Sequence, residues 1–176
     1  KLTNRDMAIL PILAHPDPRL REHAQPVTVF DEELARLVAN LSETLRVSGG
    51  IGLAAPQTGD RRRVLVIDLS GGESPPEVYI NPELQPGTTR CLVEESCLSV
   101  PGVVGNVVRA ISVRVRAQDP QGNPFERELE GMPAVCLQHE VDHLRGTLFI
   151  DRLPLLQRLR LRLRRGQLAK SPAPVA

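Results

Sequence analysis

The stretch Gln138-His139-Glu140-Val141-Asp142-His143-Leu144 lies inside a run, 132–144, that predicts a buried helix ending at a basic last turn and a glycine, Arg145-Gly146. Histidines four residues apart on a helix project from one face, about 6 Å apart along the axis, so both imidazoles can bind one divalent cation. Glu140 lies beside the first imidazole, where its carboxylate can accept a proton from water. The alternative is a chance histidine pair on a solvated face, but the apolar surroundings favour a metal site.

A catalytic metal site needs a third protein ligand and one open position, and cysteine is the obvious supplier. Cys136 shares the predicted helix but lies seven residues from His143, about 10 Å along the axis, so we interpret it as a packed core thiol. Cys97 follows a strand-like run and precedes Pro101-Gly102, a bend that can present a thiolate to a cleft. Its place in the sequence favours Cys97 over Cys91 as the third metal ligand but does not exclude Cys91.

Outward from this helix, the sequence predicts an α+β fold with antiparallel sheet. A helical stripe of leucine and valine runs from the N-cap Asp31 to Gly49-Gly50. Strand-like runs then follow one another without a helix between each pair. They are expected at 64–68, 78–81, 90–93, 107–116 and 125–129. We therefore expect antiparallel sheets around a central helix that carries the two histidines.

The segment Gly49-Gly50-Ile51-Gly52-Leu53-Ala54-Ala55-Pro56-Gln57 is rich in glycine but lacks the Gly-Lys-Ser/Thr ending of a phosphate-binding loop. Its glycines allow another backbone to come close, as an edge that pairs with an extended peptide requires. A simple turn is the alternative.

The length of 176 residues predicts one domain, and 22 Lys and Arg nearly balance 21 Asp and Glu. Seven of the basic residues lie in 152–170 without any acid, which leaves 15 basic against 21 acidic residues elsewhere. Leucines at helical spacing after Pro154 predict a basic C-terminal helix at about 154–170. We expect a single domain at 7–170, a short extension or vector remnant at 1–6, and a flexible tail at 171–176.

Composition also restricts the class of protein. One Tyr, three Phe and no Trp argue against stacking on single-stranded nucleic acid. No apolar run reaches the roughly 18 residues of a membrane span, and no signal-peptide core is visible in the first 25 residues. Three cysteines make a poor disulfide framework. We therefore expect an intracellular protein without membrane contact, cytoplasmic in a bacterium, with an organellar copy as the alternative.

Three segments together resemble, in order and spacing, the three motifs of the peptide deformylases. They are Gly50-Ile51-Gly52-Leu53-Ala54-Ala55-Pro56-Gln57, Glu94-Glu95-Ser96-Cys97-Leu98-Ser99 and the histidine stretch 138–144. The resemblance extends from about Ile9 to Leu153. It implies a metal-dependent hydrolase that removes the N-formyl group from the formylmethionine of newly synthesised proteins and releases formate.

The same resemblance implies a role for each matching residue. Cys97, His139 and His143 become the metal ligands, with water as the fourth, and Glu140 the general base and later the acid. The backbone N–H of Leu98 and the side-chain amide of Gln57 become donors to the oxyanion. The implied ion is Fe²⁺, with Zn²⁺, Ni²⁺ or Co²⁺ as alternatives that the same ligands suit.

Substrate contacts are implied as well. The substrate backbone is expected to pair with Ile51 and Gly52 as an added strand. The residues that match the family's methionine pocket are Gly50, Ile51, Val93, Glu95, Met132, Val135, Cys136 and His139. For the aliphatic members of this set, plain core packing is the alternative. A further partner is the ribosome, because formylated chains emerge from its phosphate-rich surface and the helix at 154–170 is basic; simple solubility is the alternative role for those arginines.

The chain departs from the family pattern at two positions. Ser96 stands before the cysteine where the motif usually has glycine, which bears on contact with the peptide and on rate. Val104 stands where many members carry a basic residue, which implies weaker affinity for the carboxyl-terminal side of the substrate.

Two rival functions remain to be separated. A zinc endopeptidase would take its third ligand from a downstream His or Glu, but no His follows His143 and the only acid after it is Asp151. A metal-stabilised RNA-binding module would close its metal with four protein ligands, whereas three converge here.

Overall fold

A computed structural model describes residues 8–168, with side chains to residue 161, so the expected extension 1–6 and tail 171–176 lie outside the described residues. The helices are α1 (Glu32–Ser48), α2 (Met132–Leu144) and α3 (Leu155–Leu168), with short 3-10 turns η1 (Pro18–Arg21), η2 (Ala55–Thr58) and η3 (Phe149–Asp151). The strands are β1 (Gly52–Ala54), β2 (Val64–Ile67), β3 (Glu77–Pro86), β4 (Arg90–Cys97), β5 (Val100–Ala110), β6 (Ser112–Gln118) and β7 (Pro124–Glu130). The expected α+β class with antiparallel sheets and a C-terminal helix is confirmed.

Helix α1 forms where its sequence signals predict it. The Asp31 side chain accepts a hydrogen bond from the N–H of Leu34 at 3.0 Å, and the helix ends at Gly49 in the left-handed conformation, with φ of 69°. Its leucine face is buried against β1 and β2. This packing fixes the glycine-rich segment that follows the helix.

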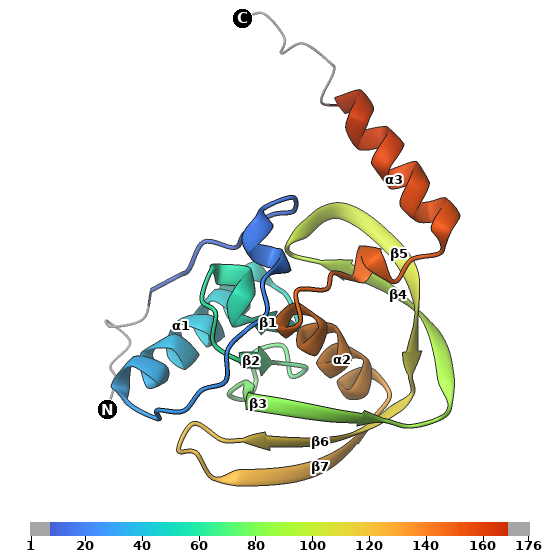
Figure 1. Cartoon of the computed structure of the whole chain (residues 1–176). Helices are drawn as coiled ribbons and strands as arrows, with labels where there is room; N and C mark the ends of the chain where they lie inside the picture. The colour runs from blue at the N-terminus through green and yellow to red at the C-terminus, as the bar shows by residue number, and fades with distance from the viewer. Residues whose placement is uncertain (1–7, 169–176) are drawn as a thin grey trace, which may run out of the picture.

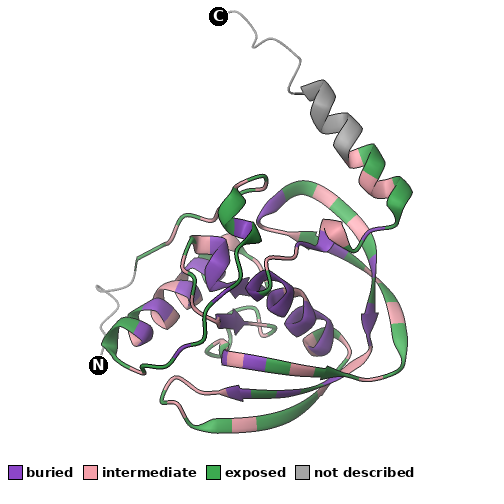
Figure 2. Cartoon of the chain, viewed as in Figure 1, coloured by how far each residue is buried: buried purple, intermediate pink, exposed green. Residues whose placement is uncertain are grey.

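Helix α2 has the predicted bounds and lies at the centre of the molecule, surrounded by both sheets (Figure 1). Ten of its 13 residues are buried, as expected of a helix that is covered on every side (Figure 2). Pro133 occupies its first turn, and Gly146 follows its end with φ of 66°. A central helix holds its side chains rigidly, which suits a metal site.

The strands form two antiparallel sheets. One has the order β1-β2-β3-β6-β7, and the other is the β4–β5 hairpin, whose tight turn is Leu98-Ser99. The register of the hairpin shifts between Ser96 and Cys97. The shift occurs at the cysteine and therefore re-aims its side chain.

The prediction of one strand over 107–116 is wrong. The chain bends at Ile111, whose N–H donates to Thr89 O and whose carbonyl accepts from Gly131 N, so that β5 pairs with β4 while β6 joins the larger sheet. Regular apolar alternation begins only at Ile111 and continues at Val113 and Val115, and it indicates which face of the strand is buried but not which strand is its partner. The strands expected at 78–81 and 90–93 are also longer, reaching Pro86 and Cys97.

Helix α3 confirms the expected C-terminal helix and extends away from the rest of the fold (Figure 1). Three leucines of its first turns stay exposed: Leu155, Leu156 and Leu159. These three leucines therefore do not pack the helix onto the domain, whereas Leu161 packs against a core cluster that includes Val100 and Phe149. Leu163 lies outside the described side chains. No helix among the described residues is long and apolar enough to cross a membrane.

Candidate metal centre and active site

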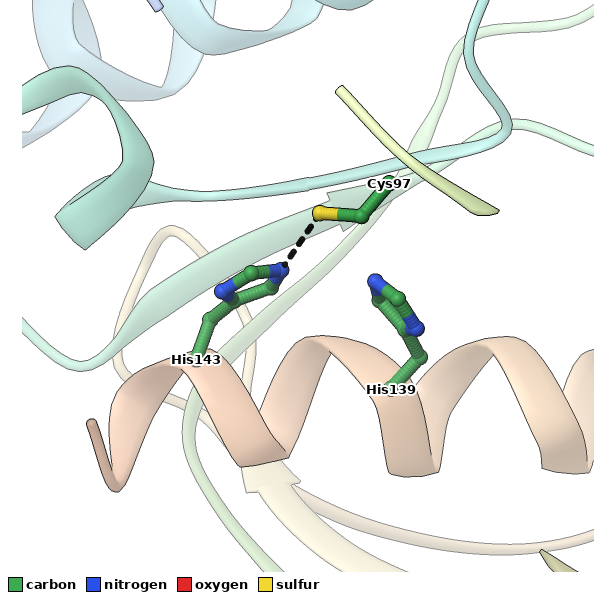
Figure 3. A group of neighbouring side chains, drawn as sticks. All are labelled: Cys97, His139 and His143. Atoms are coloured by element: carbon green, nitrogen blue, oxygen red, sulfur yellow. Dashed lines mark hydrogen bonds between the residues drawn. The ribbon is translucent and has the colours of Figure 1, made fainter. Parts of the chain in front are cut away.

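Three side chains of the metal-ligand type converge between α2 and the end of β4. Ligand atoms of Cys97, His139 and His143 all lie within 4.8 Å of one another. Both imidazoles project from one face of α2 toward the sulfur, as Figure 3 shows, and His143 Nε2 lies 3.3 Å from Cys97 Sγ. Cys91 lies on β4 with its sulfur near the carbonyl of Arg109, outside this group. The structure thus identifies Cys97, and not Cys91, as the cysteine that lies with the two histidines.

The ring of His139 is oriented by a carboxylate. Its Nδ1 lies 2.8 Å from Glu95 Oε2, and a carboxylate accepts, so Nδ1 carries the proton and Nε2 is left for a metal. Glu95 is in turn held by the buried Arg109 through two hydrogen bonds of 2.6 and 2.9 Å. Burial acts to raise the pKa of Glu95, but the bonds from Arg109 and His139 outweigh it and hold that pKa at about 2. Glu95 is therefore a permanent anion beneath the ligand.

The donor set fits a divalent ion. Burial lowers the pKa of His143 well below its usual value, which keeps this imidazole in the neutral form that binds metals. The N–H of Ser99 points at Cys97 Sγ from 3.4 Å and supports a thiolate. Two buried side-chain atoms among the described residues lack any hydrogen-bond partner, Glu140 Oε2 and His143 Nδ1, and both belong to this centre. One thiolate and two imidazoles leave an open coordination position, the pattern of a catalytic site.

Glu140 lies against β1 because residue 52 is a glycine. A Cβ at Gly52 would lie 2.5 Å from Glu140 Oε1 and 2.9 Å from its Cδ and Cγ. The carboxyl group is buried, and burial raises its pKa to about 7. Gly52 is thus in close contact with a side chain of α2, while its expected pairing with an extended peptide backbone stays a prediction.

Gln57 is fixed with its amide nitrogen toward the metal centre. Its Oε1 accepts from the N–H of Ala54 at 2.8 Å, so Nε2 faces Ser99 Oγ at 3.2 Å and Cys97 Sγ at 3.7 Å. Leu98 follows Cys97 directly in the hairpin turn. Both expected oxyanion donors therefore lie beside the expected ligands.

A cavity of about 590 Å³ opens in front of the metal centre. Glu140, Gln57 and Leu98 border it together with Cys97 and His139, whereas His143 is not among its lining residues. It contains all the residues expected to contact substrate: Gly50, Ile51, Gly52, Val93, Glu95, Met132, Val135 and Cys136. Ile51 and Met132 are about half exposed at 47% and 52%, so they lie at the mouth. Cys136 is buried on the wall, and burial raises its thiol pKa, which makes it inert.

The chain matches the family model described as polypeptide deformylase over residues 9–159. It is 51% identical to a peptide deformylase of Pseudomonas aeruginosa over 157 residues, covering 89% of this chain and 94% of that protein. This chain belongs to the polypeptide deformylase family.

Solved deformylase structures share its fold. The crystal structure from Legionella pneumophila is 44% identical with a TM-score of 0.84, covering 94% of this chain and 100% of that one. A deformylase from Synechococcus elongatus, solved in complex with actinonin, is 37% identical with a TM-score of 0.84, covering 89% of this chain and 88% of that one.

As a deformylase, the chain is a metallo-hydrolase that removes the N-formyl group from newly made peptides and holds one metal ion. The family assignment removes both rivals, the zinc endopeptidase and the metal-stabilised RNA-binding module.

Two residues of this deformylase centre were missed by the sequence analysis. Arg109 is buried on β5 two residues after Val107, but the adjacent valines Val107-Val108 give the sequence no clear alternation that would place Arg109 inside. Ser99 is fully buried and binds Gln57, a contact for which the sequence carries no signal.

Proposed function

We propose that Glu140 is the general base and then the general acid of deformylation. The observation that carries this is the position of a buried carboxylate, with one oxygen unpartnered, next to converging ligands Cys97, His139 and His143. A divalent ion in such a site supplies Lewis acidity: it lowers the pKa of water and polarises a carbonyl oxygen. Glu140 accepts the proton from the attacking water and returns it to the departing amine nitrogen. A pKa near neutrality suits a group that moves a proton in both directions.

Gln57 and Leu98 are proposed as donors to the tetrahedral oxyanion. The amide of Gln57 is held by the N–H of Ala54, so its NH₂ is aimed before the substrate arrives and needs no reorientation. Such a preorganised donor lowers the activation barrier by about 3 kcal/mol.

The methionine side chain is proposed to occupy the cavity in front of the centre, between the aliphatic residues Val93, Val135 and Met132. The substrate backbone is proposed to run beside Ile51 and Gly52. Support comes from the sheet order, in which β1 is an edge strand, so its outer side has main-chain groups for one more strand.

The metal is proposed to be Fe²⁺. The support is the mixed donor set of one thiolate and two imidazoles, which suits ferrous iron as well as zinc, nickel or cobalt, together with family membership. Anaerobic purification followed by metal analysis tests this. Activity that is highest with zinc and unchanged by iron would contradict it.

The variant Glu140→Gln tests the base. The amide keeps the shape of the side chain but cannot accept a proton, so we expect full metal content and a loss of turnover of about 10²–10⁴-fold. Formate release from a formyl-Met tripeptide and metal content are measured on one preparation. Turnover near that of the parent chain would refute the assignment.

The basic helix is proposed to bring the deformylase to the ribosome. Helix α3 extends from the fold with exposed leucines, and Arg158 and Arg160 lie on it with basic residues further along. Contacts of arginine with RNA phosphate weaken steeply with salt through counterion release.

Replacing the arginines of α3 with Gln should abolish co-sedimentation with ribosomes at low salt while activity on a free tripeptide is unchanged. The positions are Arg158, Arg160, Arg162, Arg164 and Arg165. Equal co-sedimentation by both chains would remove the ribosome as a partner of this helix.

Residues 7–170 are proposed to act as one catalytic domain in the bacterial cytoplasm. Support comes from the family match over 9–159 and from the bacterial relatives. Limited proteolysis that left a fragment of this size, active in formate release, is the expected result.

A further inference from the structure

A second cavity, of about 230 Å³, shares no lining residue with the cavity of the metal centre. It lies where the ends of β3, β4 and β5 meet the face of α2 that carries Gln138 and Asp142. Four of its lining residues are arginines from separate segments of the chain: Arg90, Arg109, Arg145 and Arg152. Among its lining residues the only carboxylate is Asp142. The cavity therefore gathers positive charge around an open space.

The single carboxylate is already fully engaged. Asp142 accepts from Arg109 Nη1 at 2.6 Å and from Arg152 Nε and Nη2, both at 2.5 Å. Arg90 donates to the carbonyl of Gly87, and Arg145 forms no ion pair with any described side chain. Among the described side chains, the guanidinium groups of Arg90 and Arg145 thus have no anionic partner. A cleft lined by one sign of charge attracts ions of the opposite sign.

We propose that this cavity binds a phosphate group. Guanidinium forks match the oxygens of phosphate in pairs, and a tetrahedral ion offers oxygens in several directions. Arg90 lies at the start of β4 and Arg145 directly follows α2, so the two guanidinium groups without an anionic partner reach the cavity from separate segments of the chain. The phosphate comes either from a small soluble anion or from an RNA backbone.

The cavity lies next to the ion pairs that hold the metal-ligand candidate His139 in place. Arg152 lines the cavity and donates hydrogen bonds to Asp142. Arg109 binds both Asp142 and Glu95, and Glu95 in turn binds the ring of His139. A bound phosphate stabilises the folded state, because only the native chain brings these arginines together.

The test uses the metal-loaded full chain and the cavity variant Arg90→Gln/Arg145→Gln. Both arginines are exposed and lie outside the catalytic residues, so metal content and formate release should be unchanged. The control variant, Arg36→Gln/Arg127→Gln, loses the same charge at exposed positions outside the cavity. Binding of inorganic phosphate is measured by titration calorimetry and thermal shift, against sodium chloride at equal ionic strength.

We expect saturable phosphate binding by the parent and control chains and at least a tenfold weaker affinity in the cavity variant. A short oligoribonucleotide is the second probe. If the cavity variant binds the oligoribonucleotide more weakly than the control does but binds inorganic phosphate equally well, the natural ligand is RNA. If the cavity variant binds inorganic phosphate more weakly than the control does, the ligand is a small anion. The proposal is overturned if neither probe binds the cavity variant more weakly than the control.

Discussion

The variant Gly52→Ala should lower turnover about 10²-fold without removing the metal. The added Cβ would lie 2.5 Å from Glu140 Oε1 and 2.9 Å from two further atoms of that side chain. Ordinary carbon contacts are about 3.5 Å or longer, so the whole buried carboxyl group has to move by about 1 Å. A misplacement of that size typically lowers turnover by about 10²-fold. The overpacking itself costs about 1–3 kcal/mol of stability.

Formate release, metal content and urea denaturation on one preparation separate these effects. The matched control is Gly87→Ala, where the new Cβ meets the Ser112 hydroxyl in an equally tight contact. The residues around it line a surface pocket that shares none with the metal-site cavity. The control should keep its kcat, because the Ser112 side chain that the new Cβ meets lies outside the metal-site cavity. Parent-like turnover in Gly52→Ala would refute the placement of Glu140 against β1.

Three further substitutions test the ligand thiol, the residue before it and the buried ion pairs. Cys97→Ala should lose stoichiometric metal while Cys91→Ala retains it, because only the first sulfur joins the imidazoles; the reverse result in metal analysis would show that the wrong thiol was assigned. Ser96→Gly should keep or raise kcat/KM toward formyl-Met peptides, and a large drop would mean that the serine has its own role. Arg109→Gln should lower the free energy of unfolding by about 3–5 kcal/mol, since two carboxylates lose their buried partner; a loss under about 1 kcal/mol in urea denaturation would contradict this.

Helix α2 could be predicted from the sequence because the residues that define it lie close together in the chain. Histidine spacing, the apolar run and the closing glycine predict the bounds of α2, and the N-cap Asp31 predicts the start of α1. Position along the chain favoured Cys97 without excluding Cys91, the motif around Cys97 implied it through the family resemblance, and the convergence of its sulfur with both imidazoles selects it in the structure.

Features that depend on partners distant in sequence were not predictable. The alternation of β6 begins at Ile111, directly after the apolar residues of β5, and alternation shows which face of a strand is buried but not which strand is its partner, so the change of sheet at Ile111 was missed. The ion pairs of Arg109 join β5 to Glu95 on β4 and to Asp142 on α2, which a single sequence does not bring together. The exposed leucines of α3 show the same limit, because a helical stripe predicts an apolar face but not what covers it.

The most direct test of metal-dependent deformylation is formate release from a formyl-Met tripeptide by one preparation that is stripped of metal and then reloaded. We expect no release from the stripped chain, full recovery with one equivalent of Fe²⁺, and no cleavage of the same peptide without its formyl group. Formate release that persists in the stripped chain, or cleavage of the unblocked peptide bond after reloading, would contradict the account.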